Sequence, residues 1–205
     1  MTFAEFKVLV MQHINQNTIS GAQVPSYYNL QNDYLLRICS LLNVALNTIA
    51  TTTRPIMASF DPNDSTETKL TDMGRGWTKI SMPKDFWKMT GQGLPRFFRN
   101  GDYERTMDYR MLTDNEIVVR SRDIPSMMIT YYRYPRKVQG QDQEIIDAEE
   151  TVAICASYYV AAELARYDSP YLYQSLYNEY EAMLERLRKP LITENSRVEE
   201  AYFIG

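Results

Sequence analysis

Residues 152–167 limit more than any other stretch how this chain can fold. Their spacing is helical, yet the strongly polar residues among them are only Ser157, Glu163 and Arg166. A helix that is apolar nearly all round has to be covered from several directions. Two covers fit this pattern. Either the other helices of the same chain surround it as the centre of a bundle, or a neighbouring subunit supplies part of the cover.

Tyrosine is concentrated in the same region, because seven of the chain's sixteen tyrosines lie within residues 155–180. On a helical wheel for residues 170–189, aliphatic side chains form one arc and Tyr173, Tyr177 and Tyr180 lie in the arc beside it. Tyrosine is enriched at the cores of protein interfaces, which favours the second cover. The predicted subunit-contact residues are Tyr158, Tyr159, Tyr173, Tyr177 and Tyr180.

Apolar periodicity predicts two helices at each end of the chain. Thr2 and Glu5 have the spacing of a capping box before a helix that ends near residues 15–17. A second helix is expected over residues 26–51. Asp147 is expected to cap a third helix that runs to about Tyr167. Asp168 or Ser169 is then expected to cap a fourth, which has Pro170 at its first position and continues to Lys189.

Between these helices, Gly and Pro punctuate short runs rich in β-branched and aromatic residues. Strands are predicted near residues 56–60, 76–82, 96–99, 103–112, 116–121 and 126–134. An exposed loop is expected over residues 61–75, and a hairpin turn at 113–115. The expected fold is therefore α+β: an antiparallel α-helical bundle of two N-terminal and two C-terminal helices, with an inserted antiparallel β region. The expected domains are residues 1–54 with 141–189, residues 55–140, and an extended C-terminal docking tail at 190–205.

Charge is spread unevenly along the chain. The net formal charge is −4, with +3 in residues 55–140 and −8 in residues 141–205. The acidic block is either a solvated helix face or an electrostatically distinct docking surface. Cys39 and Cys155 both lie in apolar helical patterns, which indicates buried free thiols and suits a reducing compartment. No run is long and apolar enough for a membrane span, so no membrane partner is expected.

The sequence shows no strong catalytic or metal-binding motif, and no cofactor is expected. His13 is the only histidine and is best explained as a structural residue. Two weaker alternatives remain. Carboxylates in one loop could serve a cell-wall hydrolase, namely Asp61, Asp64 and Glu67. Interleaved basic and aromatic residues could form a β-sheet module that binds nucleic acid or sugar. The basic residues are Arg96, Arg99, Arg105, Arg110, Arg120 and Arg122, and the aromatic ones are Phe97, Phe98, Tyr103 and Tyr109.

Three stretches carry a resemblance to a known family. The first is Arg75-Gly76-Trp77-Thr78 with Met82-Pro83-Lys84-Asp85-Phe86. The second is the ladder Phe98-Arg99-Asn100-Gly101-Asp102-Tyr103, then Ile117-Val118-Val119-Arg120 and Thr130-Tyr131-Tyr132-Arg133-Tyr134. The third is the helix that begins at Asp147 and its Tyr- and Glu-rich successor. Together they resemble the head-to-tail adaptor (connector) proteins of tailed bacteriophages, in the podophage tail tubular protein A-like group, over about residues 3–189.

The resemblance implies a non-enzymatic virion protein that forms a ring, commonly of twelve copies. Such a ring joins the portal protein to the tail or nozzle protein, in the neck of the virion. Genomic DNA passes through its channel without sequence-specific binding, and the subunits reside in the host cytoplasm during assembly. The resemblance also implies that the C-terminal tail docks on the portal or on a neighbour. The residues given that role are Leu191, Ile192, Tyr202, Phe203 and Ile204.

Overall fold

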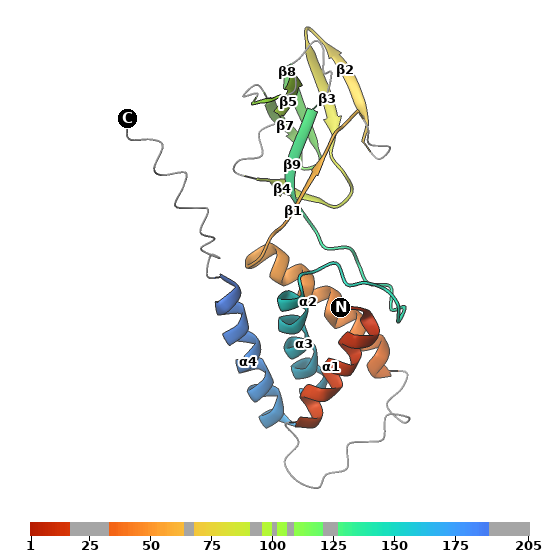
Figure 1. Cartoon of the computed structure of the whole chain (residues 1–205), viewed down its shortest axis with the longest axis vertical. Coiled ribbons are helices and arrows are strands. Elements are labelled where there is room, and N and C mark those ends of the chain that lie inside the picture. The colour runs from red at the N-terminus through yellow and green to blue at the C-terminus, as the bar shows by residue number, and fades with distance from the viewer. Residues whose placement is uncertain are drawn as a thin grey trace, which may run out of the picture. The chain divides into compact units, whose positions relative to one another are not determined.

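A computed structural model describes residues 1–16, 33–63, 68–90, 96–99, 102–105, 109–120 and 127–188. Within these residues the fold is mixed α+β, with four helices and two antiparallel sheets (Figure 1). The contact pattern divides the chain into two compact units. The helical unit comprises Met1–Arg54 and the residues from Lys137 onward, and the β unit comprises Pro55–Arg136. The helical unit is thus discontinuous in sequence.

The four helices are α1 (Phe3–Gln16), α2 (Asp33–Thr52), α3 (Glu150–Ala165) and α4 (Pro170–Arg188). The predicted capping box of α1 is confirmed, because the Thr2 amide donates to Glu5 Oε2 at 2.8 Å and the Glu5 amide donates to Thr2 Oγ1 at 3.3 Å. The predicted start of α4 is confirmed too, with the Leu172 amide 3.4 Å from Ser169 Oγ. The part of the second predicted helix before Asp33 lies outside the described residues.

Helix α3 is the central helix of its unit, because α1, α2 and α4 each contact it. Its buried residues are Val152, Ala153, Cys155, Ala156, Ser157, Val160, Ala161, Ala162, Leu164 and Ala165. Small side chains at Ala156, Ala161 and Ala162 let the surrounding helices approach it closely. A single copy of the chain therefore covers this helix, and the expectation that a neighbouring subunit covers part of it is wrong for these residues.

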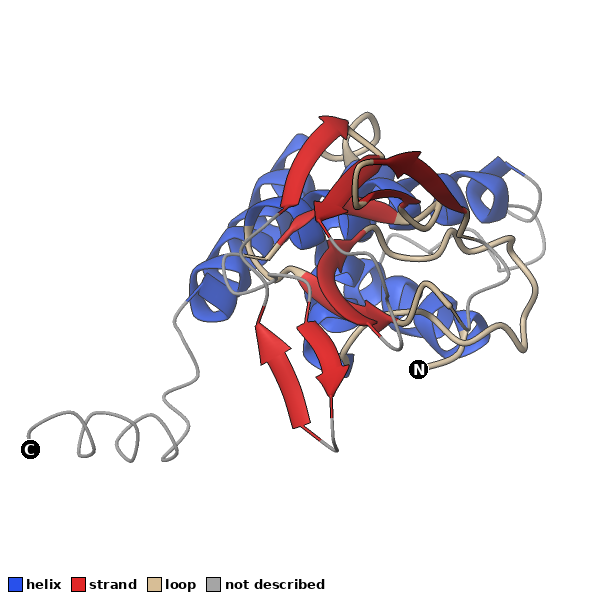
Figure 2. Cartoon of the chain, turned by 90° about the horizontal axis from the view of Figure 1, so that it is seen from above, coloured by secondary structure: helices blue, strands red, loops and turns tan. Residues whose placement is uncertain are grey.

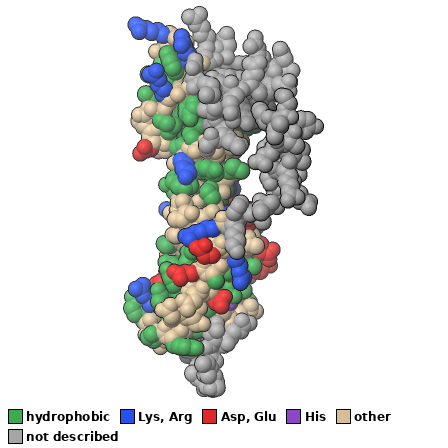
Figure 3. Space-filling view, turned by 90° about the vertical axis from the view of Figure 1, so that its left-hand side faces the viewer, with side chains coloured by type: hydrophobic (Ala, Val, Ile, Leu, Met, Phe, Trp, Pro, Cys, Tyr) green, Lys and Arg blue, Asp and Glu red, His purple; other side chains and the backbone are tan. Residues whose placement is uncertain are grey.

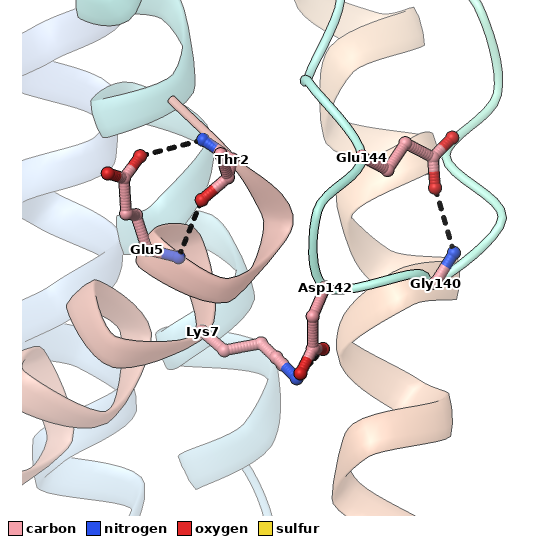
Figure 4. A network of polar contacts seen from close by, with 6 residues as sticks. All are labelled: Thr2, Glu5, Lys7, Gly140, Asp142 and Glu144. Atoms are coloured by element: carbon pink, nitrogen blue, oxygen red, sulfur yellow. Dashed lines mark hydrogen bonds and ion pairs between the residues drawn. The ribbon is translucent and has the colours of Figure 1, made fainter.

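The segment that leads from the β unit into α3 is fixed to both N-terminal helices. Asn43 on α2 holds Val138 by a pair of bonds: its Nδ2 donates to the Val138 carbonyl at 3.0 Å, and the Val138 amide donates to its Oδ1 at 2.8 Å. Lys7 on α1 pairs with Asp142 at 2.5 Å (Figure 4). The carbonyls of Asp142 and Glu144 accept from the first amides of α1, at 3.1 and 2.8 Å, so they satisfy a helix terminus as well.

The β unit contains nine described strands in two sheets (Figure 2, strands in red). They are β1 (Ile56–Phe60), β2 (Leu70–Gly74), β3 (Trp77–Ser81), β4 (Phe86–Met89), β5 (Arg96–Arg99), β6 (Asp102–Arg105), β7 (Tyr109–Thr113), β8 (Glu116–Arg120) and β9 (Met127–Arg133). One sheet has the order β1-β9-β5-β6, with β4 also paired to β9. The other has the order β2-β3-β8-β7.

One apolar cluster joins the two sheets. Ile80, Ile117 and Val119 come from the four-stranded sheet, and Ile129 and Tyr131 from β9 of the other. The Tyr131 hydroxyl is satisfied at the edge of this core, since it donates to Asp85 Oδ1 at 2.9 Å. The Pro-x-Asp-aromatic turn quoted for the family resemblance therefore has a structural role, because Asp85 anchors a buried ring.

Three local predictions need correction. Residues 70–74 form strand β2 rather than part of a loop. The predicted strand at 103–112 divides into β6 and β7. Asp147 does not cap α3, whose N-cap residue is Glu149, without a side-chain capping bond. The predicted hairpin with its turn at 113–115 is confirmed as the β7–β8 pair.

Candidate functional site

Four of the five predicted contact tyrosines form a continuous ladder between α3 and α4. Tyr159 lies 5.2 Å from Tyr180, measured between ring centroids, and Tyr180 lies 5.7 Å from Tyr177. Tyr177 and Tyr173 are stacked at 5.5 Å with an interplanar angle of 29°. The rings follow from helical spacing, because residues three and four apart on α4 share one side. We call Tyr159, Tyr173, Tyr177 and Tyr180 the tyrosine ladder.

The ladder passes from the core of the helical unit to its surface. Tyr180 is 4% exposed and belongs to the chain's own core, so it leaves almost no surface for a partner. Tyr159, Tyr173 and Tyr177 are half-buried. Burial raises the pKa of the Tyr180 hydroxyl, and it also raises the pKa values of Tyr159 and Tyr177. The ladder rings that keep some surface for another molecule are therefore Tyr159, Tyr173 and Tyr177, and the last two form a stacked pair on α4.

An ion pair on α3 faces the Tyr173 end of the ladder. Arg166 Nη1 lies 3.3 Å from Glu163 Oε2, and the Arg166 guanidinium carbon lies 5.8 Å from the Tyr173 ring centre. Next to burial, the Glu163 carboxylate is the main cause that raises the pKa of Tyr159. Glu163 and Arg166 are three positions apart, so they lie on one side of the helix. The structure shows that this side borders the tyrosines of α4.

Tyr158 is separate from the ladder and packs against α1. Its ring stacks on His13 with centroids 3.9 Å apart, and His13 Nε2 lies 3.0 Å from Ser157 Oγ. His13 is buried, and burial lowers its pKa. The structural interpretation of His13 accounts for these contacts. Tyr158 therefore joins α1 to α3, and the five predicted tyrosines do not make one surface.

Two exposed tyrosines were not among the predicted contact residues. Tyr167 is 80% exposed and lies in the turn that joins α3 to α4, and Tyr171 is 74% exposed and lies in the first turn of α4. The predicted third helix extended to about Tyr167, but α3 ends at Ala165. Tyr171 falls on the polar side of the α4 wheel, and that position could have identified it as exposed.

The loop carboxylates of the hydrolase alternative are only partly described. Asp61 Oδ1 accepts from the Asn63 amide at 2.8 Å and from Asn63 Nδ2 at 3.0 Å, which is a turn-stabilising arrangement. Asp64 and Glu67 lie outside the described residues. Within the described ranges, no cluster of His, Cys, Asp and Glu could hold a metal ion.

The predicted arginine series does not lie on one sheet. Arg96, Arg99 and Arg105 belong to β5 and β6 of one sheet, whereas Arg110 and Arg120 belong to β7 and β8 of the other. Arg122 lies outside the described residues. Of the interleaved aromatic residues, Tyr109 packs against the core of the β unit. The basic–aromatic pattern along the sequence therefore divides into two groups.

The remaining predictions concern cysteines, the membrane and docking. Cys39 and Cys155 are both free, as predicted, but only Cys155 is buried, and Cys39 is half-buried. Burial raises the pKa of Cys155 to about 12. None of the described helices combines the length and apolarity that crossing a membrane requires. The predicted docking residues Leu191, Ile192, Tyr202, Phe203 and Ile204 lie outside the described part of the chain.

No protein-family model matches the chain, and no curated protein matches it.

Proposed function

We propose that the chain is a non-enzymatic subunit of a phage connector ring. In this proposal the ring joins the portal vertex to the tail, and genomic DNA passes through its centre without sequence-specific binding. The four helices act as one antiparallel bundle, with the β unit inserted between α2 and α3. The residues after α4 dock on the portal or on a neighbouring copy. The site of action is the neck of the virion, after assembly in the host cytoplasm.

The observation that carries the proposal is the stacked Tyr173–Tyr177 pair at the surface of the helical unit. Both rings are half-buried. A standard interface buries about 800 Å² per partner. The exposed part of two half-buried rings supplies only a small share of that area, so the pair can form the apolar centre of a contact that other residues complete. A tyrosine there can exclude water with its ring while its hydroxyl binds a polar group of the partner.

A connector subunit does not require an uncovered α3. Because α1, α2 and α4 seal that helix within one chain, a single subunit can fold without a neighbour. The support that remains is the tyrosine pair, the two-unit element order and the family resemblance. A ring needs two different contact surfaces on each copy, since each subunit meets its neighbours head to tail. The Tyr173–Tyr177 pair is one candidate surface.

The test is to measure the mass of the purified chain with and without the portal protein of the same virus, followed by particle imaging for rotational symmetry. We expect rings of commonly twelve copies. The double substitution Tyr173→Ala with Tyr177→Ala should reduce the ring yield at least tenfold while circular dichroism stays unchanged. Tyr171→Ala is the matched control, because it removes a more exposed tyrosine of the same helix that lies outside the ladder. A chain that stays monomeric in the presence of portal would refute the proposal.

A further inference from the structure

Trp77 lies on the same face of the four-stranded sheet as two arginines. It begins β3 and pairs directly with Arg120 on β8. Paired residues of antiparallel strands share a face, and so do residues two apart. Arg110 pairs with Val118 and therefore belongs to the same face as Trp77 and Arg120. The opposite face carries Ile80 and other residues of the β unit's core.

Both guanidinium groups lie over the Trp77 ring. The distance from the guanidinium carbon to the ring centre is 5.8 Å for Arg110 and 6.0 Å for Arg120, within the range of a cation–π interaction. Trp77 is half-buried, and both arginines are exposed. The indole thus holds two long side chains in place without consuming their N–H donors, which stay available to an anion.

Nearby carboxylates are occupied by other groups. Glu116 pairs with Lys79 at 2.9 Å, on the same sheet face. Asp72 accepts from the Gly74 amide at 2.7 Å, which ties it to the β2–β3 turn. Among the described residues, neither Arg110 nor Arg120 has a carboxylate partner. Counted over the described residues alone, the face therefore carries an excess of positive charge beside an aromatic ring.

The β2–β3 turn adds a third arginine, Arg75, two residues before Trp77. Arg75 and Gly76 both have positive φ, 55° and 78°, as a two-residue type I′ hairpin requires. Asn or Gly is the usual choice at the first of these positions, and another residue costs about 1 kcal/mol there. Figure 3 shows Lys and Arg side chains gathered at the upper end of the β unit, with hydrophobic side chains between them.

We propose that this face, defined by Trp77, Arg110 and Arg120 with Arg75 in the adjoining β2–β3 turn, binds the phosphodiester backbone of nucleic acid. Guanidinium forks bind phosphate oxygens bidentately, and they do so whatever the base sequence. Arginines spread over β7, β8 and the β2–β3 turn suit a linear chain of regularly spaced anions. The proposal goes beyond the connector function, because it depends on residues of the β unit and needs no ring.

The experiment monitors Trp77 fluorescence in a Trp87→Phe background, where Trp77 is the sole tryptophan. The probe is a 20-base-pair DNA duplex of arbitrary sequence, titrated at several salt concentrations from about 50 to 200 mM. We expect a fluorescence change on binding and an affinity that falls as salt rises. The plot of log affinity against log salt has a negative slope, and each phosphate contact adds about 0.9 to its steepness. Arg110→Gln with Arg120→Gln should therefore make the plot less steep by about 2.

The matched control is Lys69→Gln with Lys84→Gln, which removes the same charge from two other exposed positions of the β unit. It should leave the slope nearly unchanged. If both double variants weaken the salt dependence of DNA binding equally, the effect depends only on net charge and the proposal is overturned. Absence of binding near 50 mM salt would overturn it as well. If the arginine double variant fails to fold, each single variant should make the plot less steep by about 1.

A polyglutamate competitor separates nucleic acid from an acidic protein surface. If polyglutamate binds as tightly as DNA, the partner is an acidic polypeptide and the proposal is wrong. The mass of the chain is also measured in the presence of portal protein. If the chain binds DNA but forms no ring even with portal, the DNA-binding proposal stands and the connector proposal fails. If the chain forms rings but does not bind DNA, the connector proposal stands and the DNA-binding proposal fails.

Discussion

Replacing Tyr180 by alanine is the sharpest test of how the tyrosine ladder divides between core and surface. Tyr180 is 4% exposed, and its ring lies 5.2 Å from Tyr159 and 5.7 Å from Tyr177. The substitution therefore leaves a cavity between α3 and α4 and removes two aromatic contacts. Truncation of a buried aromatic side chain costs about 3–5 kcal/mol, and each aromatic pair contributes about 0.5–1.5 kcal/mol. We expect the free energy of unfolding to fall by about 4 kcal/mol.

The comparison variant is Tyr177→Ala, which removes a neighbouring ring of the same helix that is only half-buried. It should cost less, about 1 kcal/mol, because part of its surface already faces solvent. Urea denaturation of the free chain, followed by far-ultraviolet circular dichroism, measures both values. The slope of the free energy of unfolding against urea concentration should be the same for both variants and the wild type if only stability changes. If Tyr180→Ala lowers the free energy of unfolding by less than about 1 kcal/mol, or if the two variants lower it equally, Tyr180 is not a core residue distinct from Tyr177 and the division between core and surface is refuted.

Two further predictions concern His13 and Arg75. Burial lowers the pKa of His13, so the unfolded chain takes up a proton below about pH 6.5 that the folded chain does not, and stability falls as pH decreases. Between pH 7 and 5, the free energy of unfolding of the wild type should fall by up to about 1.4 kcal/mol per pH unit more than that of His13→Gln, as measured by urea denaturation. An equal dependence on pH in the two proteins would contradict this prediction. Arg75→Asn should raise the free energy of unfolding by about 1 kcal/mol in the same assay, because asparagine tolerates positive φ better; an unchanged or lower value would show that the turn carries no strain.

Sequence reasoning succeeded where local chemistry decides the structure. Thr2 and Glu5 define the start of α1 through bonds between residues three apart, and Ser169 with Pro170 does the same for α4. The β7–β8 turn was also predictable, since it depends on a few adjacent residues. The end of α3 near Ala165 was predicted within two residues. Each of these features needs no information about the rest of the fold.

Predictions failed where burial and pairing depend on distant residues. Strand β2 has the sequence LTDMG and is mostly exposed, so its side chains show no apolar alternation. Its extended form comes from pairing with β3 at the edge of the sheet. Strand β9 pairs with β1, β4 and β5, and no local pattern predicts those partners. For the same reason, the arginines that are interleaved in the sequence lie on two sheets.

The apolar circumference of α3 shows why the candidate site was harder to predict than the fold. A helical wheel establishes that a helix must be covered, but the wheel is the same whether the cover comes from this chain or another copy. In the structure the cover comes from the same chain, because the small alanine side chains of α3 let three helices of that chain pack around it. The candidates for contact with a partner are then the side chains that stay half-buried after folding. Tyr173 and Tyr177 on the helical unit and Trp77 on the β unit are residues of that kind. Each carries a ring next to a polar or charged group, so each can bind a partner without first exposing the core.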